Sequence, residues 1–174
     1  MVKEPSTELT TRRCVLRPIT AGDAEPLHEL WSSPGVRRFL WDDEIIPIAR
    51  TRAAIEQSQR MFEEQAYGLW GAWSPSSRNI IGFGGLWPFR DLPELELLYG
   101  VTERLWGYGY AAEIAQAVMA YCFDSLNMPV VRASTDVANT ASVRVLEKLG
   151  FRCVRRATVG GLPTVFYELR PGGA

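Results

Sequence analysis

The pattern of apolar and polar positions divides the N-terminal third of the chain into one strand and two helices. Residues 15–19 are a short apolar run, which predicts a strand. Residues 20–23 fit the pattern of a helix start, and apolar residues at helical spacing follow as far as Trp31. Residues 33–35, with a central proline, predict the end of this helix, and an aromatic connection follows it. A second helix is expected over residues 47–65, where apolar residues recur every seven positions.

The middle of the chain has the two-residue period of strands. Aromatic and β-branched residues at 68–73 and 79–87 predict a hairpin, because the serine-rich and proline-containing segment 74–77 between them favours a turn. Another turn is expected at residues 90–93. Residues 94–101 then alternate, so that their odd-numbered positions form the apolar face of a third strand.

The C-terminal part returns to helical spacing and then closes the sheet. We expect a helix over residues 111–126, a strand over 130–135, a helix from Asn139 that ends at Gly150, and closing strands over 151–155 and 164–169 around Gly160 and Gly161. The order β-α-α-β-β-β-α-β-α-β-β predicts one mixed α/β domain over residues 12–170. Residues 1–11 are expected to be an N-terminal extension and residues 171–174 a loose tail.

Composition and charge exclude several classes of function. A chain of 174 residues with 47% hydrophobic content can bury one core without a disulfide or a metal. The net charge of -1 provides no strong field for nucleic acid. Cys14, Cys122 and Cys153 are far apart, which disfavours a zinc cluster, and His28 is the only histidine. No apolar run reaches the roughly 18 residues of a membrane span. We therefore expect a cytoplasmic protein with no metal, nucleic-acid or membrane partner.

A glycine-rich loop carries the strongest chemical signal. Gly107 and Gly109 stand between the third strand and the next helix, where backbone N–H groups can bind a phosphate. The alternative is that the two glycines only shape a tight turn. Gly107-x-Gly109-x-x-Ala112 also matches the dinucleotide fingerprint, but the loop comes late in the chain and Pro129 stands where that fingerprint places an acidic residue.

Four motifs in order give the chain a family resemblance. They are the strand at 96–101, the Arg104-x-x-Gly107-x-Gly109 loop, Asn139-x-x-Ser142, and the stretch at 145–151. This arrangement resembles the GNAT acetyltransferases, and most of all the branch that acetylates ribosomal-protein N-termini. The resemblance implies an α/β domain with a mostly antiparallel central sheet flanked by helices. It also implies acetyl transfer from acetyl-CoA to a primary amine by direct attack in a ternary complex, without a metal.

The resemblance also assigns residues to the cofactor. The pyrophosphate of acetyl-CoA is expected on the loop amides, with the Arg104 side chain close by. The pantetheine arm is expected beside the third strand, where that strand parts from residues 130–135. Asn139 is expected to cap a helix and also to bind the cofactor, while Tyr99 has the alternative of belonging to the core. The cofactor-binding residues are thus Leu98, Tyr99, Gly100, Val101, Arg104, Trp106, Gly107, Tyr108, Gly109, Tyr110 and Asn139.

Two residues are candidates for proton transfer. Glu96 holds the acidic position of the family and would accept the proton of the amine. Ser142 would protonate the departing thiolate, because Leu146 occupies the position where many family members have a tyrosine. The alternatives are that Glu96 is only a solvated glutamate on a strand, and that Ser142 is only a serine that faces solvent on its helix.

The sequence does not determine which amine accepts the acetyl group or whether the protein forms oligomers. A protein N-terminus, a free amino acid, a polyamine and an antibiotic all remain as acceptors. Several aromatic residues are expected to divide between the core and an acceptor pocket, namely Phe39, Trp41, Trp70, Trp73, Trp87 and Phe89. Exposed aromatic side chains would also fit a homodimer. The alternative to an enzyme is an acyl-CoA-binding sensor or interaction module that has lost catalysis, and a dinucleotide-dependent enzyme ranks below both.

Overall fold

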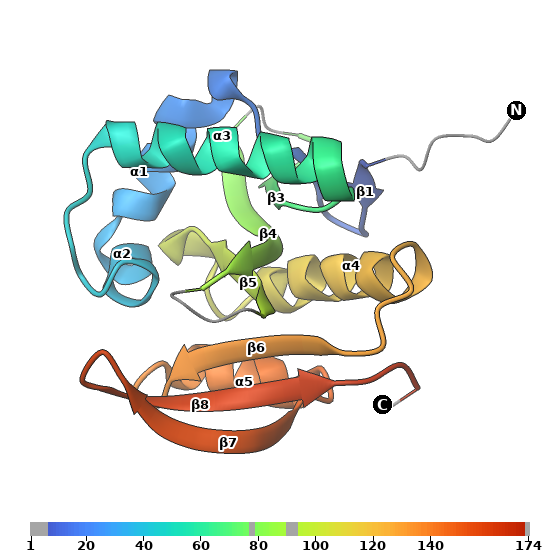
Figure 1. Ribbon diagram of the computed structural model, residues 1–174. Helices are drawn as coiled ribbons and strands as arrows, with labels where there is room; N and C mark the ends of the chain where they lie inside the picture. The colour runs from blue at the N-terminus through green and yellow to red at the C-terminus, as the bar shows by residue number, and fades with distance from the viewer. Residues whose placement is uncertain (1–6, 77–78, 90–93, 173–174) are drawn as a thin grey trace, which may run out of the picture.

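The computed structural model describes residues 7–76, 79–89 and 94–172, and an eight-stranded sheet forms its centre (Figure 1). The strands lie in the order β1-β2-β3-β4-β5-β6-β8-β7, and within the described part of the chain only β5 and β6 pair in parallel. Their bounds are β1 Leu9–Thr10, β2 Val15–Pro18, β3 Leu69–Trp73, β4 Ile80–Pro88, β5 Leu95–Val101, β6 Val131–Asp136, β7 Arg152–Val159 and β8 Leu162–Leu169. The expected mixed α/β fold with a mostly antiparallel sheet is confirmed.

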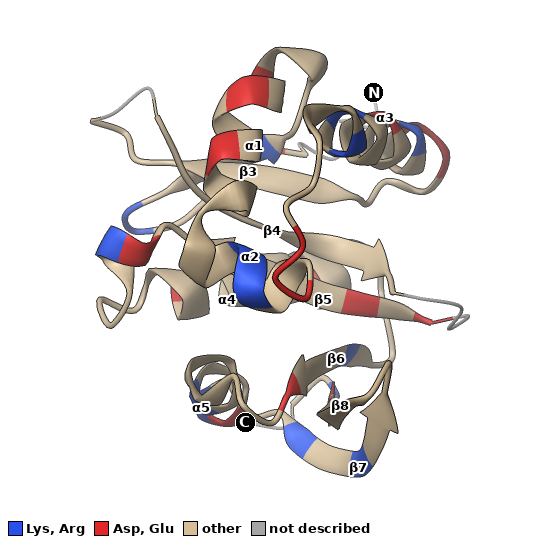
Figure 2. Ribbon diagram, turned by 90° about the vertical axis from the view of Figure 1, so that its left-hand side faces the viewer, with Lys and Arg blue, Asp and Glu red and all other residues tan. Residues whose placement is uncertain are grey.

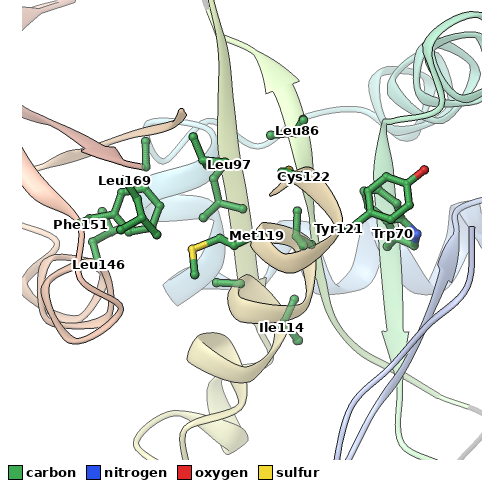
Figure 3. Packing of buried hydrophobic residues seen from close by; sticks show 14 of the residues in the cluster. Trp70, Leu86, Leu97, Ile114, Met119, Tyr121, Cys122, Leu146, Phe151 and Leu169 are labelled. Atoms are coloured by element: carbon green, nitrogen blue, oxygen red, sulfur yellow. The ribbon is translucent and has the colours of Figure 1, made fainter. Parts of the chain in front are cut away.

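In the residues that the structure describes, five α-helices cover the two faces of this sheet. They are α1 Ala24–Ser32, α2 Pro34–Leu40, α3 Ile48–Gln65, α4 Tyr110–Asp124 and α5 Thr140–Lys148, with short 3-10 turns at η1 Ala21–Asp23 and η2 Glu103–Leu105. Residues of α1, α2 and α3 pack around Phe83 of β4 in one hydrophobic cluster. Residues of α4 and α5 belong to a second cluster, which Figure 3 shows around Leu97 and Ile114. We call the two sides of the sheet the α2 face and the α4 face.

The alternation within β5 follows the expected pattern. Leu97 and Val101 are buried in the α4-face cluster, and Tyr99 packs against it. Leu98 packs against the α2-face cluster, and a Cβ atom at Gly100 would lie 2.6 Å from the Phe83 ring. Odd positions therefore face α4 and even positions face α2.

Two elements differ from the sequence expectation. Residues 33–35 do not lead into a connection, because Pro34 begins the separate helix α2, which runs to Leu40. The N–H of the first residue in a helix has no partner within the helix, so a proline at that position costs no hydrogen bond. The proline expected to end one helix can therefore start the next. The sheet also begins before residue 12, because Leu9 and Thr10 of the expected extension pair with β2.

The other predicted elements are present, with boundaries shifted by a few residues at most sites. The helix start at residues 20–23 is built as expected, since the Asp23 carboxylate accepts a hydrogen bond of 2.8 Å from the Thr20 N–H. Ser77, the turn at residues 90–93 and the last two residues of the expected loose tail lie outside the described residues.

Candidate functional site

A cavity of about 460 Å³ lies where β5 and β6 diverge. The two strands are in register at Glu96 and Arg132. Beyond that pair, residues 97–101 of β5 and 133–136 of β6 both line the cavity. Figure 2 shows α5, β6, β7 and β8 set apart from β5, α2 and α4. The lining includes residues of α2 on one face of the sheet and of α5 on the other, so the cavity passes through the sheet.

The glycine loop borders the α4-face end of this cavity. Gly107 and Gly109 have φ angles of +80° and +82°, which side chains with a Cβ atom rarely adopt. A Cβ atom at Gly107 would meet no protein atom within 4 Å, so the space beside its backbone is open. The N–H groups in the first turn of α4 have no acceptor within the helix. The loop therefore offers an anion a set of backbone donors.

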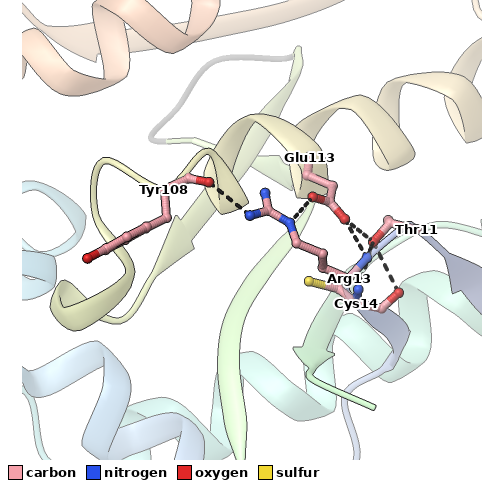
Figure 4. Close-up of polar contacts among 5 residues, drawn as sticks. All are labelled: Thr11, Arg13, Cys14, Tyr108 and Glu113. Atoms are coloured by element: carbon pink, nitrogen blue, oxygen red, sulfur yellow. Dashed lines mark hydrogen bonds and ion pairs between the residues drawn. The ribbon is translucent and has the colours of Figure 1, made fainter. Parts of the chain in front are cut away.

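A partly buried ion pair anchors the loop to the segment just before β2 (Figure 4). The Arg13 Nε donates to Glu113 at 2.7 Å, and its Nη1 donates to the Tyr108 carbonyl oxygen at 3.0 Å. Glu113 also accepts hydrogen bonds from the Thr11 hydroxyl and the Arg13 N–H. These bonds outweigh the effect of burial and hold the pKa of the Glu113 carboxyl below its ordinary value. Sequence reasoning missed this anchor, because about 100 residues separate its two sides.

The beginning of α5 places the Ser142 hydroxyl in the cavity, beside the Tyr99 hydroxyl of β5. Asn139 caps the helix by accepting a hydrogen bond of 3.2 Å from the Ser142 N–H. The Tyr99 hydroxyl lies 2.8 Å from Ser142 Oγ, and both residues line the cavity. Burial raises the pKa of Tyr99 to about 12, so its phenol stays protonated at neutral pH.

Two cations on α5 line the same cavity and were not identified from the sequence. They are Arg144 and Lys148, which are four residues apart and so share one side of the helix. Both follow Ser142 on the helix that the sequence predicts from Asn139, at two and six residues after it, so their place on that helix was visible in the sequence. They add positive charge to the end of the cavity on the α4 face.

Glu96 lies outside the lining of the main cavity. Its side chain is only 3% exposed and borders a second cavity of about 300 Å³, together with Arg132 and Arg155. The Ser134 hydroxyl donates to Glu96 Oε2 at 2.5 Å, and Ser134 lines the main cavity. Burial raises the pKa of the Glu96 carboxyl, and the hydrogen bond from Ser134 offsets this only in part. Ser134 therefore stands between the cavity and the carboxylate.

The structure brings most of the predicted site residues together around the main cavity. Those that line it are Leu98, Tyr99, Gly100, Val101, Trp106, Gly107, Gly109, Tyr110, Asn139 and Ser142. Arg104 and Tyr108 are exposed and do not line it, so contact of these two side chains with a ligand stays a prediction. Of the candidate pocket aromatics, Phe39 and Phe89 line the cavity, whereas Trp70 is in the core and Trp41, Trp73 and Trp87 pack against the α2-face cluster.

Within residues 7–76, 79–89 and 94–172, no three His, Cys, Asp or Glu side chains are grouped so that they could hold a metal ion. In the same part of the chain, every helix is too short or too polar to cross a membrane.

Comparison with known proteins places this geometry in context. Residues 13–152 match the family described as an acetyltransferase (GNAT) domain. The uncharacterized N-acetyltransferase YoaA of Bacillus subtilis is 28% identical over 148 residues, which cover 83% of this chain and 82% of that protein.

Solved structures share the fold. An acetyltransferase of Agrobacterium tumefaciens superposes with a TM-score of 0.81 at 23% identity, over 94% of each chain. RimL, a ribosomal L7/L12 alpha-N-protein acetyltransferase in complex with coenzyme A, superposes with a TM-score of 0.79 at 14% identity, over 94% of this chain and 97% of that one. At these identities the likeness concerns the fold.

Proposed function

Because the chain belongs to the GNAT acetyltransferase family, we propose that it transfers the acetyl group of acetyl-CoA to a primary amine that attacks in a ternary complex. The observation that carries this proposal is the cavity through the sheet between β5 and β6. An acyl donor can enter it from the glycine loop and an amine from the α2 face. The two reactants would then meet beside β5 without a covalent enzyme intermediate.

The residues at the α4-face end fit acetyl-CoA. The open space beside Gly107 accepts a pyrophosphate close to the backbone, and the N–H groups of the first turn of α4 donate to it. Arg144 and Lys148 supply positive charge for the phosphates. The parted edge of β5 offers backbone groups to an extended pantetheine arm. Acetyl-CoA supplies the activated thioester carbonyl, and a backbone N–H of β5 stabilises the negative charge on its oxygen.

Glu96 serves as the base in this proposal, acting through Ser134. An amine must lose a proton before it attacks, and a second proton leaves nitrogen as the amide forms. Ser134 accepts the proton from the cavity side while its own proton passes to Glu96 Oε2. The raised pKa of Glu96 makes its carboxylate a stronger base than an exposed glutamate.

Ser142 serves as the acid. As the new C–N bond forms, the C–S bond breaks and the sulfur takes up a proton. In this step Ser142 Oγ donates the proton. The Tyr99 hydroxyl lies 2.8 Å from Ser142 Oγ, where either oxygen can donate, so it is placed to donate to Ser142 in turn. The products are an N-acetylated amine and the free thiol of CoA, with the net release of one proton from the original ammonium group.

Turnover in a mixture of amines tests the proposal. Incubation with labelled acetyl-CoA and a cell lysate, followed by mass spectrometry, is expected to show label on amines together with release of CoA thiol. Tight binding of CoA without thiol release across a broad amine panel would instead favour the non-catalytic binding module. Stabilisation by NAD but not by acetyl-CoA would favour the dinucleotide-dependent enzyme.

A further inference from the structure

We propose that Glu103 and Trp106 are positioning residues, which hold α2 against the cavity and so connect the glycine loop with the α2-face end where the amine enters. This inference rests on the proposed function, because it concerns the two ends of the same cavity. Glu103 begins η2, and Trp106 directly precedes Gly107 of the loop. Their contact with α2 means that acetyl-CoA on the loop stabilises that helix.

The first turn of α2 takes its cap from a distant part of the chain. Ser33 occupies the N-cap position, but its hydroxyl donates to the Leu30 carbonyl oxygen at 2.8 Å, and among the described residues it forms no cap bond to α2. Pro34 follows and has no N–H, so the N–H of Gly35 is the first that the helix presents. This N–H donates to Glu103 Oε1 at 2.7 Å. A carboxylate here satisfies a free N–H group and interacts favourably with the helix dipole.

The contact with η2 requires a residue without a side chain at position 35. A Cβ atom at Gly35 would lie 2.5 Å from the indole ring of Trp106 and 2.7 Å from the carboxyl carbon of Glu103. These separations are far below van der Waals contact, so the backbone of α2 lies directly against both side chains. Glycine also lowers the stability of a helix relative to alanine. Gly35 therefore weakens α2 by itself and makes room for the contact that holds it.

Trp106 connects this contact to β5 and to the glycine loop. Its indole Nε1–H donates to the Val101 carbonyl oxygen at 3.0 Å, and its backbone N–H donates to the Glu103 carbonyl oxygen at 3.1 Å. Val101, Trp106 and Gly107 all line the main cavity. A ligand bound by the loop therefore restrains the segment that holds α2.

The stability of α2 determines the shape of the α2-face end of the cavity. Val36, Phe39 and Leu40 line the cavity from this helix. The helix has only seven residues, and one of that length is not stable in water without contacts to other elements. Acetyl-CoA on the glycine loop therefore favours the folded α2. By linkage, an amine that contacts α2 favours the binding of acetyl-CoA to the same degree.

Hydrogen exchange of the α2 amides, measured with and without CoA, tests the inference. CoA carries the phosphates, and its use requires no knowledge of the amine. In wild type, CoA at about 100 times the Kd measured by calorimetry is expected to slow exchange over residues 35–41 by about tenfold. Glu103→Ala is expected to lose this effect, since the Gly35 N–H loses its acceptor. Glu103→Gln should retain most of it, because the amide oxygen can accept the same hydrogen bond.

Two glycine-to-alanine variants form a matched pair. Gly35→Ala forces the far ends of the Trp106 and Glu103 side chains aside, so it should lose the effect of CoA although alanine favours a helix. Gly22→Ala is the control, because among the described residues a Cβ atom there would meet only Thr20 Oγ1, at an ordinary contact distance of 3.8 Å. It should keep the wild-type effect. A purely structural contact would change exchange equally with and without CoA, and the ratio of the two rates would stay as in wild type.

Failure of the inference and failure of the proposed function are distinguishable. If calorimetry shows that neither CoA nor acetyl-CoA binds, the proposed function is wrong. If CoA binds but the exchange over residues 35–41 stays the same, only the connection between the loop and α2 is wrong. An equal loss of the effect in Glu103→Gln and Glu103→Ala, or a loss in Gly22→Ala, would also overturn it. Glu103 is exposed, so its variants are expected to fold, and melting curves check this.

Discussion

The hydroxyl groups of Tyr99 and Ser142 lie 2.8 Å apart, although 43 residues separate them in the chain. Tyr99 stands on the α4 face of β5 and Ser142 on the first turn of α5. The tyrosine expected in many family members would occupy position 146, but Leu146 is buried in the core here. The phenol beside Ser142 thus comes from the strand β5 and not from the helix.

This pair makes a prediction about additivity. Ser142→Ala is expected to lower kcat by on the order of 10²-fold, as loss of a general acid does. Tyr99→Phe removes one hydrogen bond to that acid and is expected to lower kcat about tenfold. If Tyr99 acts through Ser142, as proposed, the double variant should be no slower than Ser142→Ala alone. Steady-state kinetics of the four proteins at saturating acetyl-CoA measure this. Independent, multiplying effects would show that Tyr99 only supports the packing.

The role of Glu96 as the base can be tested by measuring turnover as a function of pH. Glu96→Gln should lower turnover by on the order of 10²-fold or more near neutral pH and regain part of it as the pH rises, because more of the amine is then already neutral. Ser134→Ala should behave in the same way if Ser134 carries the proton. Ser142→Ala is the control, since a higher pH does not replace an acid. Equal turnover of wild type and Glu96→Gln across the pH range would assign the base elsewhere.

The buried Glu96 carboxylate should lower the stability of the folded protein at neutral pH. Burial raises the pKa of Glu96 in the folded state, so the folded protein binds the proton more tightly than the unfolded chain does. Stability contributed by the protonated group is then present below the unfolded pKa and is lost as the pH rises through the folded value. Glu96→Gln should therefore raise the melting temperature relative to wild type at pH 7 and lose this advantage near pH 4. A variant that melts lower at pH 7 would contradict this.

The sequence predicted the elements whose periodicity is clear, and much of the site with them. The alternation in β5 placed Tyr99 and Val101 on one face, and the glycine loop was located by residue type alone. It did not predict α2, because Pro34 is equally compatible with the end of a helix and with the first position of a new one. The sequence also did not predict the burial of Glu96. The alternation along a strand assigns a side chain to one face of the sheet, but it does not show which of two cavities on that face the side chain borders.

Contacts between distant segments set the remaining part of the site. The Arg13 and Glu113 side chains meet only because β2 lies close to the first turn of α4, and no local pattern encodes that. The same holds for the hydrogen bond between Tyr99 and Ser142. Arg144 and Lys148 could have been identified from their helical spacing after Asn139, but cations on a short helix are usually solvated and gave no reason to be chosen.

The anchor of the glycine loop predicts a coupling between Glu113 and binding. Glu113→Gln loses the ion pair that holds Arg13 against the loop, so the affinity for CoA should fall several-fold while the fold is kept. Because the folded pKa of Glu113 is below its ordinary value, its stabilisation is present above the unfolded pKa and is lost as the pH falls through the folded one. The variant should therefore lose less stability than wild type on acidification below about pH 4. Calorimetry measures the CoA affinity, and melting curves against pH measure the stability. An unchanged CoA affinity would show that the Arg13–Glu113 pair does not contribute to CoA binding.

Gly107 provides the most direct test of the anion site, because Gly161 supplies a matched control. Both glycines have positive φ, at +80° and +83°, and a Cβ atom at either would meet no protein atom within 4 Å. Valine should therefore strain the backbone comparably at the two positions. Only at Gly107 would its side chain occupy the space proposed for the pyrophosphate. In wild type, acetyl-CoA at 100 times its Kd should add roughly 2.7 kcal/mol to stability, which raises Tm by several degrees. We expect Gly161→Val to keep this shift and Gly107→Val to lose it, and an equal shift in both variants would mean that the loop is only a turn.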